Sequence, residues 1–72
     1  MEIDLHGIKH EDVKQFLDKA IWECMKKKKS RLYVITGNSD DMKKIVTTVS
    51  REHGLTAVES MFNSAELLID LI

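Results

Sequence analysis

The hydrophobic and polar positions of this 72-residue chain follow two different periods, and the changes of period divide it into six elements. Over residues 10–26 the apolar side chains recur at spacings of three and four, as in a helix that packs through one face. Residues 40–53 repeat this spacing and predict a second helix. Shorter stretches that are rich in branched and aromatic residues predict strands. These strands are 2–5, 32–36, 57–62 and 66–72.

The resulting order is β-α-β-α-β-β, in a single domain that spans residues 1–72. Two successive β-α-β units make the first three strands parallel. The last stretch, 66–72, is the most continuous apolar run of the chain, so we expect it in the middle of the sheet, buried on both faces or nearly so. Asn63-Ser64, just before it, predicts a two-residue hairpin turn.

The first helix carries most of the predicted core. Cys24 lies on its apolar stripe, and we expect it to be packed as a small hydrophobe rather than to act as a nucleophile. Trp22 lies off the centre of the stripe. We expect its ring to cover the edge of the core, and the alternative is an exposed ring that contacts a partner. The stripe consists of Val13, Phe16, Leu17, Ala20, Ile21 and Cys24, with Met25 at its margin.

The second helix has clear signals at both ends. Ser39 is a favourable N-cap, and Asp40 and Asp41 in the first turn suit the helix dipole. Gly54 predicts a left-handed stop after the last turn, with Leu55 beyond it as the hydrophobic contact that often accompanies such a stop. The apolar stripe of this helix consists of Met42, Ile45, Val46 and Val49.

Asp4 and His6 close the first predicted strand and are the first candidates for chemistry. They are one residue apart, so an extended backbone points both side chains to the same face. Gly7 then permits a sharp exit from the strand. A carboxylate beside an imidazole suits proton transfer or anion binding, although a strand that ends in a polar pair and a glycine is also common without such a role.

The parallel strands bring three polar segments to one edge of the sheet. Residues 4–7, 36–39 and 63–64 follow the carboxyl ends of the three strands, where ligands of open α/β sheets tend to bind. Both helices begin at this edge, and helix N-termini offer N–H groups to an anion such as phosphate. The basic run Lys26–Arg31 belongs to the opposite edge. We expect it to be a solvated helix end, the alternative being a contact with the backbone of a long nucleic acid.

The composition says more about the cellular compartment of the protein than about its chemistry. The single cysteine excludes an internal disulfide and fits a reducing compartment. The chain has no apolar run of about 18 residues and no signal-peptide pattern, so we expect a cytoplasmic protein that does not enter a membrane. We also expect a monomer. The net charge of −1 predicts no strong overall attraction to nucleic acid.

The order of the elements and two motifs resemble the Smr domain, the small MutS-related domain. That family has an L-D-x-H-G motif at its first strand, matched here by Ile3-Asp4-Leu5-His6-Gly7, and a T-G-x-G loop after its second strand. The resemblance covers nearly the whole chain. It implies an α+β two-layer sandwich, similar to the C-terminal domain of translation initiation factor three. In that fold two helices cover one face of a four-stranded mixed sheet of order 1-2-4-3, with strand 4 antiparallel.

The resemblance also implies a function, because Smr domains are associated with nicking of DNA and with cleavage or binding of RNA. It assigns His6 to proton transfer or phosphate polarisation, and Asp4 to orienting it or helping to activate the nucleophile. Thr36 and Gly37 would present backbone N–H groups to a phosphate. The expected phosphate-binding set is Gly7, Lys9, Thr36, Gly37, Asn38, Lys43 and Lys44.

One departure from the family pattern leaves two hypotheses open. Ser39 stands where the T-G-x-G loop has its second glycine, and Asp40 and Asp41 add negative charge where a phosphodiester would dock. The first hypothesis is a domain that binds DNA or RNA, with endonuclease activity as an extension. We expect no dedicated metal site, although Mg²⁺ could bridge carboxylates to phosphate in an active nuclease. The second is an inactive Smr-like fold that binds a protein partner.

Overall fold

The computed structural model describes residues 1–61 and 63–71. The predicted order of elements is confirmed, and the ends of both helices agree with the sequence pattern within one residue. The elements are β1 (Glu2–Asp4), α1 (His10–Lys26), β2 (Arg31–Ile35), α2 (Asp40–Glu52), β3 (Thr56–Glu59) and β4 (Glu66–Asp70).

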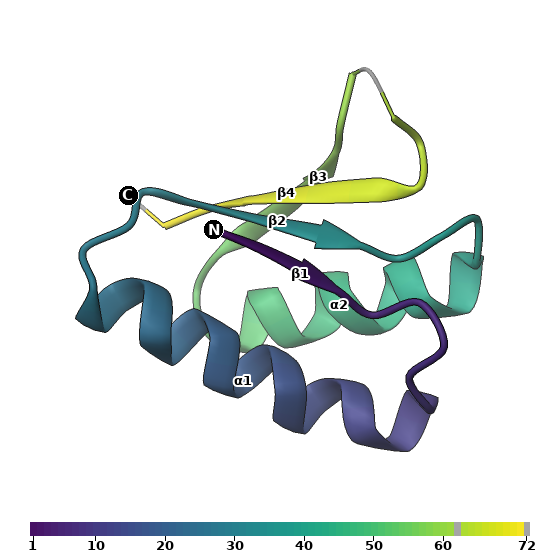
Figure 1. Ribbon diagram of the computed structural model, residues 1–72, viewed down its shortest axis with the longest axis horizontal. Helices are drawn as coiled ribbons and strands as arrows, with labels where there is room; N and C mark the ends of the chain where they lie inside the picture. Colours follow the sequence, from purple (N-terminus) through teal and green to yellow (C-terminus); the bar gives the residue numbers. More distant parts are fainter. Residues whose placement is uncertain (62, 72) are drawn as a thin grey trace.

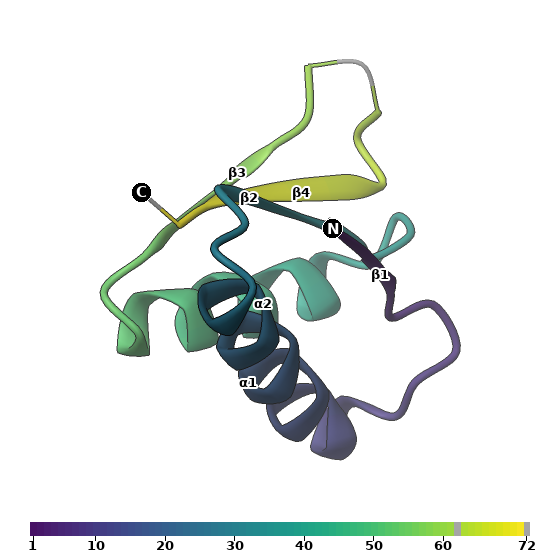
Figure 2. The same ribbon diagram turned by 60° about the vertical axis from the view of Figure 1, so that its left-hand side comes forward.

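The four strands form one mixed sheet in the order β1-β2-β4-β3. Strand β1 pairs in parallel with β2, and β4 lies antiparallel between β2 and β3. Both helices lie on the same side of this sheet, α1 and α2 next to one another (Figures 1 and 2). The predicted α+β two-layer sandwich and the central position of β4 are therefore confirmed.

Burial on β4 alternates, because only one face of the sheet is covered by helices. Leu67 and Ile69 face the helices and are buried, whereas Leu68 between them is only half-buried. The expectation that this strand is buried on both faces was wrong. Ile72, at the end of the predicted strand, lies outside the described residues.

The core forms where the stripes of the two helices meet this covered face. The predicted core residues of α1 are buried except for Phe16, whose ring is 53% exposed, and Met25 at the margin of the stripe, which is also exposed. Trp22 is 68% exposed, so the expectation that it covers the edge of the core was wrong. It follows the fully buried Ile21 by one residue, and that step turns a side chain about 100° around the helix. Cys24 is buried as expected, and burial raises the pKa of its thiol, which disfavours a reactive thiolate.

Helix α2 is held at both ends as its sequence predicts. The hydroxyl of Ser39 accepts a hydrogen bond from the backbone N–H of Met42 (3.1 Å). Gly54 has φ +75°, and the N–H of Leu55 donates to the carbonyl of Ser50 (2.8 Å). These contacts fix where α2 begins, at the edge of the sheet that carries the candidate site.

The connection between β3 and β4 is longer than the predicted two-residue turn. Strand β3 ends at Glu59, and the N–H of Ser60 still donates to the carbonyl of Glu66 (3.0 Å). The chain then leaves the sheet, and Met61 is 93% exposed. The prediction of a strand through residues 57–62 was therefore wrong in its last part, as far as it falls on described residues, and Phe62 lies outside them.

Candidate functional site

The first strand leads into a tight turn that displays His6. The N–H of Ile8 donates to the carbonyl of Leu5 (3.0 Å), and Gly7 between them has φ +86°. An i to i+3 hydrogen bond with a positive φ at the third residue is the pattern of a type II turn, which favours glycine there. His6 and Gly7 are consequently exposed at the end of β1.

Asp4 stabilises this turn instead of contacting the imidazole. Its Oδ1 accepts a hydrogen bond from the backbone N–H of His6 at 2.8 Å. Within residues 1–61 and 63–71 no hydrogen bond joins the Asp4 carboxylate to the His6 ring. The expected pairing of the two side chains was based on an extended backbone, and it fails because the strand ends at Asp4.

The ring of His6 lies against the loop that follows β2. A Cβ placed on Gly37 would be 3.2 Å from Cδ2 of His6, closer than a comfortable contact. Gly37 also has φ +68°, a conformation that favours glycine. Gly37 therefore lets this loop pass close to the imidazole, and it brings the two motif segments together as the sheet topology predicts.

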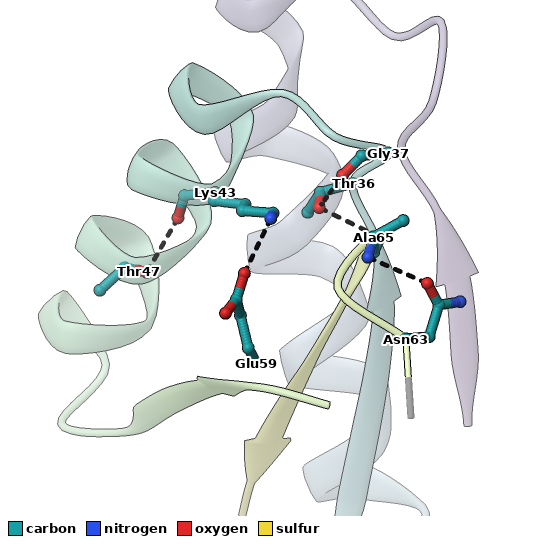
Figure 3. A network of polar contacts seen from close by, with 7 residues as sticks. All are labelled: Thr36, Gly37, Lys43, Thr47, Glu59, Asn63 and Ala65. Atoms are coloured by element: carbon teal, nitrogen blue, oxygen red, sulfur yellow. Dashed lines mark hydrogen bonds and ion pairs between the residues drawn. The ribbon is translucent and has the colours of Figure 1, made fainter. Parts of the chain in front are cut away.

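The backbone N–H groups of Thr36 and Gly37 are already occupied. Both donate to the carbonyl of Ala65, at 2.8 and 3.1 Å. The hydroxyl of Thr36 is buried and contacts the carbonyls of Gly37 (2.9 Å) and Ala65 (3.2 Å), as Figure 3 shows. The expectation that these two N–H groups are presented to a phosphate was wrong, because the carbonyl of Ala65 occupies the position that the phosphate would need.

The segment before β4 is the third part of this edge. The amide oxygen of Asn63 accepts a hydrogen bond from the N–H of Ala65 (2.9 Å), and the N–H of Glu66 donates to the carbonyl of Asn63 (3.1 Å). This local turn places the Ala65 carbonyl beside Thr36 and Gly37 (Figure 3). The three polar segments thus converge at one edge, which we call the His6 edge: residues 4–7, 36–39 and 63–65.

The three candidate lysines have different surroundings. Lys9 is the exposed N-cap residue of α1. The Nζ of Lys43 makes an ion pair of 2.8 Å with Glu59 of β3 (Figure 3). Lys44 lies on another side of α2, in a groove of about 510 Å³ between the helices that also includes His10 and Lys14. Lys43 and Lys44 are thus engaged elsewhere, whereas Lys9 is exposed three residues beyond His6. Asn38 is an exposed residue of the loop after Gly37.

The partners that occupy this edge were not identified from the sequence. Glu59 and Ala65 act through contacts with residues 16 and 28 to 29 positions away in the chain. No local pattern marks a carboxylate or a carbonyl for such a role, since it depends on how β3 and β4 are paired.

The structure also bears on the predicted basic run, on metal sites and on membrane-spanning helices. The basic run Lys26–Arg31 lies at the opposite edge, beside the N-terminus of β2, and the N–H of Leu71 donates to the carbonyl of Ser30 (2.9 Å). Among the described residues, no group of three or more His, Cys, Asp and Glu side chains could hold a metal ion. A search of the same residues finds no helix suited to cross a bilayer.

Comparison with known families agrees with this architecture. A family model described as Smr domain matches residues 3–66, from β1 to the start of β4. Searches among curated proteins and among solved structures found no match. Since the matched region includes nearly all of the chain, with both motif segments of the His6 edge, the protein belongs to the Smr domain family.

Proposed function

We propose that this protein binds nucleic acid through the His6 edge, with His6 and Gly7 in contact with the phosphate backbone. The observation that carries this proposal is the exposed His6 ring, which lies against Gly37 where three polar loops meet. Membership of the Smr family supports the ligand class. The N-termini of both helices lie on this side of the sheet and attract anions, although acidic residues in both first turns oppose that attraction. The single buried cysteine supports a reducing, cytoplasmic setting.

Binding has more support than cleavage. A general base is oriented by its hydrogen-bond partner, and the one described contact of the Asp4 carboxylate is with the backbone of the turn. In a cleavage reaction His6 would therefore act as the proton-transfer group, while Asp4 would position it indirectly, by fixing the turn. We propose endonuclease activity only as an extension of binding, to be decided by assay.

An amide NMR titration of the whole chain tests the proposal. The probes are a short single-stranded RNA, a DNA hairpin and a DNA duplex, each at 50 and 200 mM NaCl. We expect shifts at His6, Gly7, Lys9 and Gly37 that weaken with salt, because phosphate contacts release counterions. His6→Ala should reduce binding severalfold, whereas His53→Ala, which removes a histidine paired with Asp18 on the helices, should not.

The outcomes separate the two hypotheses. Shifts at this edge justify a cleavage assay with and without Mg²⁺, in which His6→Ala should abolish any activity while the amide spectrum shows an intact fold. The absence of shifts with all three probes would overturn the proposal and favour a protein-interaction module. The latter is consistent with the internal partners of Gly37 and Lys43.

A further inference from the structure

The solvent side of α1 carries aromatic and basic side chains in alternation. Phe16, Lys19, Trp22 and Lys26 follow one another at spacings of three or four residues, so each lies about one turn beyond the last. All four are exposed, Trp22 most conspicuously among the aromatic rings. At a rise of 1.5 Å per residue the row is roughly 15 Å long. We call these four residues the α1 row.

The row continues into a basic turn whose charges have no ion-pair partner among the residues that the structure describes. Lys27, Lys28 and Lys29 are exposed, and no ion pair to them or to Lys26 is found among residues 1–61 and 63–71. Arg31 differs, because it pairs with Asp70 at 3.6 Å. Four ammonium groups are therefore available at the end of the α1 row.

The backbone of this turn is unusual for its sequence. Lys28 has φ +57°, and it is the one non-glycine residue with a positive φ in the described part of the chain. Glycine is the residue that usually follows a helix in this conformation. The N–H of Lys29 donates to the carbonyl of Cys24 (2.8 Å), which fixes the turn against α1. The chain thus has a lysine at a position where the backbone conformation favours glycine, which has no side chain.

The charge of this region differs from that of the whole molecule. Residues 19–31 contain six basic residues and one acidic residue, Glu23, which gives a net charge of +5 in a chain whose total is −1. The side chain of Glu23 is half-buried. Asp70, which pairs with Arg31, offsets one of these charges. The segment 19–31 is still clearly positive on a nearly neutral protein, which favours a polyanionic partner.

We propose that the α1 row and Lys27–Lys29 bind single-stranded nucleic acid, with a base stacked on Trp22 and phosphates held by the lysines. This deepens the proposed function and rests on it for the class of ligand, but it uses other residues. An exposed ring between ammonium groups is the arrangement that sequence-tolerant single-strand binding uses. In a duplex the bases are stacked on one another, so Trp22 would have no free base face to contact.

A lipid surface fits these observations less well. An interfacial helix needs a continuous apolar face that it can bury in the bilayer. The apolar face of α1 is already used by the core, and Lys19 separates the two exposed rings of the α1 row.

Trp22 is the only tryptophan of the chain, so its fluorescence reports directly on this surface. A twelve-nucleotide oligo(dT) should quench the emission of the whole protein in a saturable way. If four lysines each neutralise a phosphate, the apparent Kd should rise roughly fiftyfold between 50 and 200 mM NaCl. The double substitution of Lys27→Gln with Lys28→Gln should halve the slope of log Kd against log salt.

Matched variants separate this surface from the His6 edge. Trp22→Ala, at an exposed position, should weaken binding of labelled oligo(dT) about tenfold in an anisotropy titration, and Trp22→Phe should recover part of the loss. Lys14→Gln removes a lysine of the same helix that is paired with Glu52 and lies outside the α1 row, and it should change neither measurement. His6→Ala should leave the quenching of Trp22 intact. Quenching of Trp22 without NMR shifts at His6 would reject binding at the His6 edge and support binding at the α1 row.

Three results would overturn the inference. One is an emission that oligo(dT) does not change although the labelled oligomer binds. Another is equal quenching by the oligo(dT)·oligo(dA) duplex. The third is quenching by phosphatidylserine vesicles but not by oligo(dT), which would assign the surface to a membrane.

Discussion

The two ends of the sheet contain polar residues of similar kinds but differ in how many of their groups have partners within the protein. At the His6 edge the Asp4 carboxylate, the hydroxyl of Thr36 and the N–H groups of Thr36 and Gly37 all have partners. At the opposite end Lys26–Lys29 make no described ion pair, and Trp22 stands out into solvent. The first region is organised by internal hydrogen bonds, and the second presents unpaired charge.

This difference changes what each region can do for a ligand. A backbone N–H that already donates within the protein must lose that hydrogen bond before it can bind a ligand. An unpaired exposed lysine loses little more than counterions and side-chain freedom. The His6 edge therefore offers a ligand a rigid surface with few free polar groups. The basic end offers electrostatic attraction from flexible side chains that are not held in one geometry. Substitutions at the two ends should consequently affect stability and binding in different proportions.

The largest effect on stability is expected for Gly37→Ala. The new side chain would meet Cδ2 of His6 at 3.2 Å, in a backbone conformation with φ +68°. The conformation alone costs about 1–2 kcal/mol of unfolding free energy, measured by urea denaturation. Gly54→Ala is the matched control, since it has φ +75° and open space around the new Cβ. A loss for Gly37→Ala no greater than that for Gly54→Ala would show that the His6 contact contributes nothing.

Asp4→Ala should have the next largest effect. It removes the oxygen that accepts the N–H of His6, and one such hydrogen bond contributes about 1 kcal/mol to stability. Asp4→Asn keeps an oxygen in that position and should retain most of the unfolding free energy. If both variants lose the same amount, the charge of Asp4 matters and the turn does not.

Lys28→Gly should move stability and binding in opposite directions. Glycine relieves the left-handed conformation at φ +57°, so the unfolding free energy should rise by roughly 0.5–1 kcal/mol after the entropy cost of glycine. The salt slope of oligo(dT) binding should fall by about 0.7, the contribution of one phosphate contact to a single strand. A stabilised variant with an unchanged slope would remove Lys28 from the binding surface.

The smallest effect is expected for Arg31→Gln. Its pair with Asp70 is exposed on both sides, and such pairs contribute between about 0 and 1 kcal/mol. Because Arg31 is already paired, its loss should also reduce oligo(dT) binding less than the loss of an unpaired lysine such as Lys27. An equal loss of affinity would show that ion pairing within the protein does not govern the availability of these charges.

The sequence predicted the elements where one physical signal dominates. Helical periodicity identified α1 and α2, Ser39 and Gly54 gave the ends of α2, and the apolar run of β4 indicated its central place. The alternation of burial on β4 was not predicted, since a run of apolar residues does not say how many faces are covered. Trp22 was placed wrongly because the general tendency of rings to be buried was given more weight than its angle on the helix.

The candidate site was predicted only as a set of neighbours. Topology correctly brought His6 and Gly37 to one edge, but the state of each polar group depended on partners far away in the chain. Ala65 occupies two N–H groups and Glu59 pairs with Lys43, and neither residue carries a local signal of this. Hydrogen-bond partners across a sheet depend on register, which a single sequence specifies weakly.

The place of β4 also determines the order in which the molecule can be built. The strand that joins β2 to β3 is the last of the six elements to be synthesised, so both β-α-β units must wait for it with open edges. Before residues 66–70 leave the ribosome, β2 lacks its main partner and Thr36 and Gly37 lack the carbonyl of Ala65. We therefore expect the pairing of β4 to be a late step of folding, which closes the sheet and the His6 edge together.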